Sequence, residues 1–227
     1  MKQLVLFLMG LLIISCSTTH LVDNWKNPEI DTYEPTKVLV VGITSNIEAR
    51  EIFEQQLKGE LEARGIVAIT SLDFFNPTVE TEKMTEEDLK TLEGKLIIDG
   101  FDTILLTKVV GVEDKIIYKK EYDDFDNTYR KFNEEYLMYQ DIFYNPDYYE
   151  NYTVYNTETS MYCICPTKER ELIWKGYIDI VDPKTTKETI NHYVRLVIIV
   201  LEEQQLISPK IDDENIDKEQ NKDEPIL

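Results

Sequence analysis

Histidine, cysteine and basic residues are scarce in this sequence, and each shortage excludes a class of function. The 227 residues include two histidines, three cysteines, and 24 lysines and arginines against 44 aspartates and glutamates. The resulting formal charge of -20 would repel nucleic acid and anionic lipid surfaces, so we expect no nucleic-acid partner. Three cysteines are too few for a disulfide framework, so the fold has to depend on an apolar core.

Recognisable catalytic motifs are also missing. No Gly-x-Ser-x-Gly elbow or paired-histidine zinc motif occurs, and the turn at residues 42–45 lacks the glycines and lysine of a phosphate-binding loop. His20 and His192 have no nucleophile and orienting acid that the sequence assigns to them, so we interpret His192 as a surface or half-buried helix residue. The acidic run at residues 123–126 fails the calcium-loop pattern, because Tyr129 stands where glycine is required. We predict a protein that is not an enzyme and that binds no cofactor or metal.

Long apolar runs are absent except at the N-terminus. Lys2 gives a positive start, and residues 4–14 are apolar apart from Gly10. This run is too short to span a bilayer but has the length of a signal-peptide hydrophobic region. It ends in Ile-Ile-Ser-Cys, which resembles the lipobox of bacterial lipoproteins. That resemblance implies that residues 1–15 are removed and that Cys16 carries acyl chains, including palmitate, which anchor the protein. The alternative is an ordinary signal peptide with a chance cysteine at its end.

The predicted anchor also suggests a location. Ser17 follows the cysteine, where an aspartate would favour retention at the inner membrane. We therefore expect a lipid-anchored protein of the cell envelope, at the periplasmic face of the outer membrane, whose membrane contact is the lipid on Cys16. Loss of Lys2 with the signal peptide lowers the formal charge from -20 to -21.

The mature chain predicts a single α/β (α+β) domain, in which helices cover a mixed sheet. The apolar run at residues 37–43 is typical of a strand buried on both faces, and residues 66–70 predict a second strand. Between them, a helix begins with a capping box of Ser45 and Glu48 and ends before Gly65. A strand, helix and strand joined this closely predict a parallel unit.

The middle of the chain predicts another helix and a longer strand. Thr85 and Asp88 open a helix that ends near Gly100. Residues 102–110 predict a strand, which can extend toward Tyr118. This strand leads into a segment of different composition.

The end of the domain predicts a hairpin and a helix. Residues 153–165 and 171–181 predict two more strands. Leu172, Trp174, Ile178 and Ile180 alternate onto one face of the second strand, so we predict an antiparallel pair. Asp182 caps the last helix and Pro183 occupies its first position. The predicted order is therefore β-α-β-α-β, a tyrosine-rich insertion, and β-β-α.

These patterns also predict domain boundaries. Residues 16–35 comprise the lipidated cysteine and a polar tether, and residues 36–207 form the domain, with an insertion at 115–152. Residues 208–227 are acidic with little apolar content, which predicts a disordered tail.

The two cysteines other than Cys16 form no recognisable site. A separation of two places Cys163 and Cys165 on one face of a strand. A bond between them would be strained, and a metal site would need further ligands that the sequence does not offer. We interpret them as two small buried residues.

Tyrosine is concentrated in one segment. Residues 118–162 hold eleven of the 14 tyrosines, interleaved with acids and asparagines. Tyrosine combines a large apolar face with a polar tip, which suits recognition surfaces. We predict a binding surface that includes Tyr129, Tyr136, Tyr139, Tyr144, Tyr148, Tyr149 and Tyr152. The alternative is that these side chains pack back on the sheet.

Several stretches, in order, resemble a family of Gram-negative envelope lipoproteins that has no assigned activity. Their domain is similar in element order to the amino-terminal domain of TolB and to the curli-secretion-channel lipoprotein. The resemblance implies a domain of about residues 23–207 that acts by binding, without catalytic residues to carry over. The matching stretches are WKNPE (25–29), KVLVVGI (37–43), ELEARGI (60–66), TILLTKVVGVED (103–114), VYNTETSMY (154–162) and ELIWKGYIDIVDP (171–183).

Three functional hypotheses follow. The first is a non-enzymatic binding or scaffold module that contacts another envelope protein or a glycan. The second is a hydrolase of envelope glycans that uses carboxylates such as Glu134, Glu135 or Asp141, which would have to face one cleft about 5–9 Å apart. The third is a subunit of a ring or pore, which rests on analogy alone. The sequence leaves the oligomeric state open.

Overall fold

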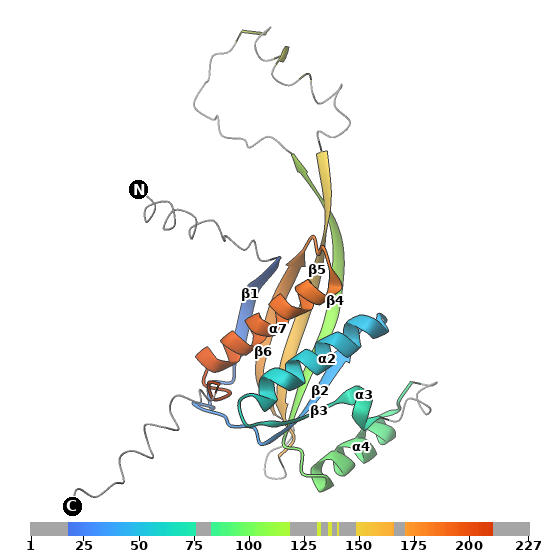
Figure 1. Ribbon diagram of the computed structural model, residues 1–227, viewed down its shortest axis with the longest axis vertical. Coiled ribbons are helices and arrows are strands. Elements are labelled where there is room, and N and C mark those ends of the chain that lie inside the picture. The colour runs from blue at the N-terminus through green and yellow to red at the C-terminus, as the bar shows by residue number, and fades with distance from the viewer. Residues whose placement is uncertain are drawn as a thin grey trace, which may run out of the picture.

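The chain forms a mixed sheet with helices on both faces (Figure 1). The computed structural model describes residues 18–75, 83–118, 131–132, 136–137, 140, 149–165 and 171–210, with the backbone alone at 117–118 and 149–150. The six strands lie in the order β1-β6-β5-β4-β2-β3. The elements are β1 (Thr19–Lys26), β2 (Lys37–Ile43), α2 (Ile47–Glu62), β3 (Val67–Thr70), α3 (Ser71–Phe74), α4 (Glu86–Ile98), β4 (Thr103–Tyr118), β5 (Tyr149–Cys163), β6 (Leu172–Val181) and α7 (Thr186–Glu203). The predicted α/β (α+β) class is confirmed.

The predicted parallel unit is present at one side of the sheet. β2 pairs in parallel with β3 and with β4. Val38, Leu39 and Val40 of β2 are all buried, because α2 covers one face of this strand and α4 the other. The continuous apolar run in the sequence reflects this burial on both faces.

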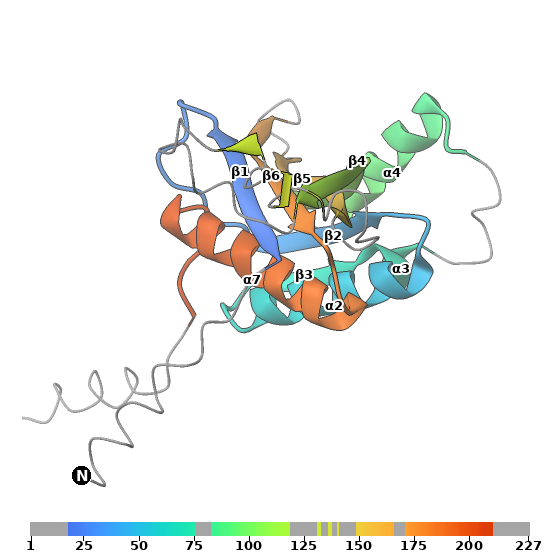
Figure 2. The ribbon, with the colours of Figure 1, turned by 90° about the horizontal axis from the view of Figure 1, so that it is seen from above.

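The larger core lies between the sheet and the pair α2 and α7. Figure 2 shows these two helices on one side of the sheet, with α4 on the other. The buried stripe of each helix faces the strands, as the helical spacing predicts. The main residues of this core are Phe53, Leu57 and Leu61 of α2, Val194, Val197 and Leu201 of α7, and Trp174 and Ile178 of β6.

The segment predicted as a tether contains a strand. β1 pairs antiparallel with β6, from Thr19 opposite Ile180 to Lys26 opposite Trp174. The chain then stays on the domain, since Ile30 is 7% exposed. The prediction of a tether over residues 16–35 is therefore wrong from Thr19 onward. An edge strand has one free edge and an exposed face, so it lacks the apolar run that marks a central strand.

Two strands continue beyond the rest of the sheet. β4 pairs with β2 only as far as Lys108, and β5 pairs with β6 only from Val154 onward. Beyond these points β4 and β5 pair with each other as far as Tyr118 opposite Tyr149 (Figure 1). We call residues 109–118 and 149–153 the ribbon. The predicted insertion at 115–152 is therefore too long at both ends.

Candidate functional site

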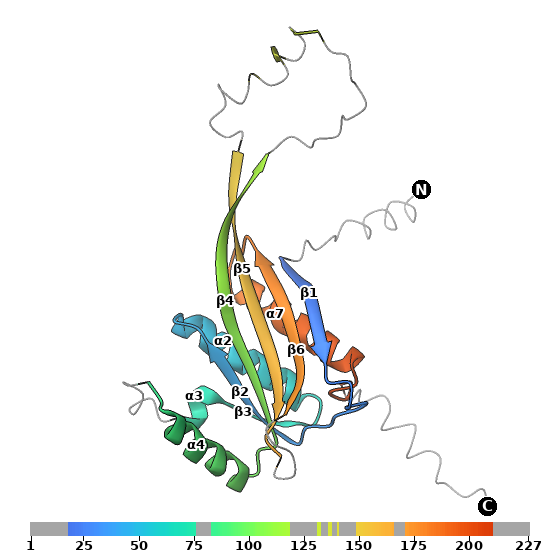
Figure 3. The same ribbon diagram turned by 180° about the vertical axis from the view of Figure 1, so that it is seen from behind.

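One face of the sheet has no helix over most of its strands. α2 and α7 cover the opposite face, and α4 covers only the corner formed by Leu39 and Ile104. Figure 3 shows β1, β6, β5 and the middle of β4 lying uncovered on this side. We call this surface the open face; its central residues are Trp25, Lys108, Glu158, Tyr162, Lys175 and Tyr177.

Strand register brings these residues together from four strands. Trp25 of β1 lies opposite Lys175 of β6. Tyr177 of β6 lies opposite Glu158 of β5, and Glu158 lies opposite Lys108 of β4. Side chains directly opposite each other in neighbouring strands share a face, so all five project from the same side of the sheet.

The centre of the open face is a carboxylate between two ammonium groups. Oε1 of Glu158 lies 3.0 Å from Nζ of Lys108 and 3.0 Å from Nζ of Lys175. The Ser160 hydroxyl donates a further hydrogen bond to this oxygen at 3.1 Å. Burial alone would raise the pKa of Glu158, but the hydrogen bonds from Lys175, Lys108 and Ser160 outweigh it and lower the pKa. The hydrogen bond to Glu158 raises the pKa of Lys175. These two shifts favour the carboxylate form of Glu158 and the ammonium form of Lys175 at neutral pH.

Aromatic rings flank this charged centre. Trp25 is 45% exposed and Tyr177 is 38% exposed, while Tyr162 is half-buried. Exposed aromatic rings next to charged groups are typical of binding surfaces, because they offer a large contact area with little rotamer entropy to lose. The open face has the chemistry of a contact surface.

Another buried carboxylate, Glu54 of α2, has a structural role. Its oxygens accept hydrogen bonds from the Gly42 backbone N–H at 2.9 Å, the Arg50 Nε at 3.0 Å, the Ser71 hydroxyl at 2.6 Å and the Leu72 backbone N–H at 3.1 Å. These bonds fasten α2 and α3 to the carboxyl end of β2. Ligands often bind at this end of parallel strands, but here Glu54 is already satisfied by the protein itself.

A buried hydroxyl network joins α7 to the sheet. The Tyr193 hydroxyl lies 2.7 Å from Oγ1 of Thr159, which lies 2.8 Å from Oγ1 of Thr107. Burial raises the pKa of Tyr193, so the phenol stays neutral. This network is also structural.

The two histidines of the chain lie beside one pocket. His20 of β1 and His192 of α7 line a cavity of about 350 Å³ together with Asp182, Lys184 and Glu188. Within the described residues, no three potential ligands are placed to hold a metal ion. His192 is half-buried, as its sequence position predicts.

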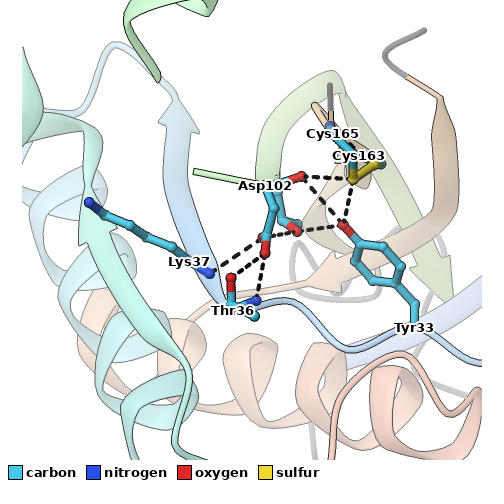
Figure 4. The surroundings of a disulfide bond; sticks show 7 residues. Tyr33, Thr36, Lys37, Asp102, Cys163 and Cys165 are labelled. Carbon is cyan, nitrogen blue, oxygen red and sulfur yellow. Dashed lines mark hydrogen bonds between the residues drawn. A yellow bond between two sulfur atoms is a disulfide. The ribbon is translucent and has the colours of Figure 1, made fainter. Parts of the chain in front are cut away.

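Cys163 and Cys165 form a disulfide, which corrects their interpretation as two separate buried residues (Figure 4). β5 ends at Cys163, so Cys165 is not held at the spacing of a strand, and their Cα atoms lie 5.4 Å apart. Cys165 lies against the Asp102 carbonyl oxygen and the Tyr33 hydroxyl. The bond closes the turn where β5 leaves the sheet.

The predicted tyrosine surface is only partly described. Tyr136 is 46% exposed, and Tyr152 is half-buried on the ribbon, opposite Lys115. Tyr149 lies in β5 without a described side chain. The remaining predicted residues lie outside the described residues: Cys16, Tyr129, Tyr139, Tyr144, Tyr148, and the carboxylates Glu134, Glu135 and Asp141.

The sequence patterns did not place Trp25, Lys175 and Tyr177 on one surface. The alternation Lys175, Tyr177, Asp179 on β6 indicates a polar face. Only recognition of β1 as a strand would have added Trp25 to it.

The comparisons with known proteins do not assign a family. No family model and no curated protein matches the chain. Similar solved structures include the PelC dodecamer from Paraburkholderia phytofirmans, which is 10% identical, with 82% of this chain and 97% of that chain covered and a TM-score of 0.41. They also include the lipoprotein GNA1162 from Neisseria meningitidis, which is 12% identical, with 74% and 99% covered and a TM-score of 0.39. A likeness at this level establishes neither a shared family nor a shared activity.

Proposed function

We propose that this protein is a lipid-anchored, non-enzymatic binding module of the cell envelope that contacts another envelope protein through the open face. The observation that carries the proposal is the exposure of Trp25 and Tyr177 around the Lys108, Glu158 and Lys175 group, on the part of this face that α4 leaves uncovered. Both oxygens of Glu54 accept hydrogen bonds within the protein, and Oε1 of Glu158 is held by two lysines and Ser160. Neither presents a free acid or base for catalysis.

The anchor would hold the domain close to its membrane. Cys16 precedes the first residue of β1 by three positions, so the lipid and the sheet would be separated by about 10 Å of extended chain at most. No helix within the described residues is long and apolar enough to cross a membrane. The lipid on Cys16 is the proposed membrane contact, at the periplasmic face of the outer membrane.

The proposal is tested by affinity capture from crosslinked native envelopes with the full chain as bait. The double variant Trp25→Ser/Tyr177→Ser should reduce capture of a specific protein at least tenfold. The matched control is Ile47→Ser/Ile98→Ser, which removes two exposed apolar side chains from α2 and α4. It should capture the protein like the parent.

Other outcomes would redirect the proposal. Equal capture by the parent and the open-face variant would exclude the open face. If the triple variant Tyr144→Ser/Tyr148→Ser/Tyr149→Ser alone lost the protein, the contact would lie in the tyrosine-rich segment. Capture of a glycan in place of a protein would show that the partner is a glycan, and cleavage of that glycan would favour the hydrolase hypothesis.

A further inference from the structure

The ribbon leaves one long strand edge without a partner. β2 ends at Ile43, opposite Lys108, and within the described residues no other strand pairs with that edge of β4. Residues 109–118 therefore present unpaired backbone N–H and C=O groups over about 33 Å. An edge of this kind is a template for another strand.

The ribbon face beside this edge carries an exposed apolar row. The row consists of Val109, Val112 and Ile116 of β4. Their partners in β5 are Thr157, Tyr155 and Asn151, which are separated by even numbers of residues and so share one face of that strand. The row therefore projects from a single face of the ribbon. The exposed fractions of its three residues are 44%, 58% and 64%. A two-stranded ribbon is marginally stable alone, and an exposed row of β-branched residues is the face that a third strand would cover.

A pocket lies at the base of the row. It measures about 130 Å³, and its lining includes Ile43, Phe53, Val109, Ile180, Ile190 and Tyr193. A chain that continued along the line of β2 would pass over this pocket and could place an apolar side chain in it.

The other edges of the sheet are better protected against pairing. β1 has a bulge between Leu21 and Asp23, and β3 has only four residues. Bulges and short strands are the usual protection of an edge. The β4 edge has one bulge, after Val109, but residues 111–118 beyond it pair regularly with β5 and form a longer stretch than β3.

The acidic side chains of the ribbon favour a basic partner strand. Glu113 lies opposite Val154, on the face away from the apolar row, and Asp114 interrupts the row itself. Lys115, the cation of this stretch, is paired with Glu113 at 3.5 Å. A second copy would bring the same acids and another charge of -20, whereas a strand with basic side chains on one face would place its cations beside Glu113.

We propose that the free edge of β4 binds an extended basic segment of a partner protein by strand addition. The segment pairs with residues 109–118 and alternates β-branched and basic side chains. The β-branched side chains cover Val109, Val112 and Ile116, and the basic ones face Glu113. This site is separate from the open face.

The test uses the full chain in detergent micelles and a fluorescein-labelled ten-residue peptide of alternating valine and lysine. The control peptide has the same lysines, with proline in place of valine, so it keeps the charge but cannot add a strand. Fluorescence anisotropy should show at least tenfold tighter binding of the valine peptide. Hydrogen exchange of the 109–118 amides should slow when it binds.

Variants locate the site. Val112→Ser/Ile116→Ser should weaken binding of the valine peptide at least fivefold, whereas Trp25→Ser/Tyr177→Ser should leave it unchanged, which separates this proposal from the open-face proposal. Equal affinity for both peptides, or no protection at 109–118, would overturn the proposal. Protection that rises with protein concentration without peptide would identify a second copy as the occupant and would also overturn it.

Discussion

At the scale of single residues, the packing of Trp174 depends on a glycine. The indole is fully buried and lies over Gly176, two residues further along the same face of β6. A Cβ at position 176 would lie 2.4 Å from the Trp174 ring. The buried ring has no space to move away, because the core around it is closely packed.

Gly176→Ala should therefore destabilise the protein by about 1–3 kcal/mol through overpacking. Urea unfolding measures this change. Gly59→Ala is the matched control, since a Cβ there meets nothing within 4 Å in α2 and should stabilise the helix by up to about 1 kcal/mol. Equal effects of the two substitutions would show that Trp174 does not lie over Gly176.

Glu158 makes stability depend on pH. Its pKa in the folded state is lowered below the ordinary value of 4.5, so the stabilisation is present above that value and is lost as pH falls through the folded pKa. Glu158→Gln should cost about 1–3 kcal/mol at pH 7, because it removes the charge from hydrogen bonds with two lysines.

At pH 3, the difference between parent and Glu158→Gln should shrink. Unfolding by urea at both pH values gives the comparison. If Glu158→Gln lowered the free energy of unfolding equally at pH 3 and pH 7, the charge of Glu158 would make no contribution to stability.

At the scale of elements, helix starts show what local sequence can and cannot specify. Thr85 and Asp88 open α4 as predicted, and they form a capping box there. By contrast, α2 is capped by Asn46, whose Oδ1 accepts from the Ala49 N–H at 3.0 Å, and not by Ser45. Serine and asparagine are equally good caps, so adjacent candidates leave the start ambiguous by one residue.

The last helix shows a larger error. It begins at Thr186 with Thr185 as its cap, so the prediction of Asp182 and Pro183 at its start is wrong. Asp182 has a φ of 46°, and its N–H donates to the Thr153 carbonyl oxygen, so this residue ends β6.

The cap of α2 gives a direct test. Asn46→Ala should lower stability by about 1 kcal/mol, because it leaves the Ala49 N–H without its side-chain acceptor. Ser45→Ala should change it by less than about 0.5 kcal/mol. Thermal or urea unfolding distinguishes the two, and the reverse order of effects would restore Ser45 as the cap.

At the scale of the whole molecule, elements with strong apolar patterns were predictable and the polar edge strand β1 was not. β2, α2 and α7 follow from continuous or helical apolar spacing, because they are buried on the faces that this spacing marks. β1 was missed because its sequence is polar and it gains its order from pairing with β6, whose residues lie 148 to 161 positions further along the chain.

The candidate site depends on that same long-range pairing. Trp25, Lys175, Glu158 and Lys108 are separated in sequence and meet only through strand register. The predicted tyrosine surface, in contrast, was read from local composition. Composition can indicate that a segment suits recognition, but it cannot place side chains from four strands on one face.

The most direct test of the open face as a contact surface is site-specific photo-crosslinking in native envelopes. A photoreactive phenylalanine derivative would replace Tyr177 in one full-length protein and Glu203, exposed at the end of α7, in another. We predict a discrete adduct of higher mass from position 177 and none from position 203. Adducts of equal yield at both positions, or none at position 177, would contradict the proposed function.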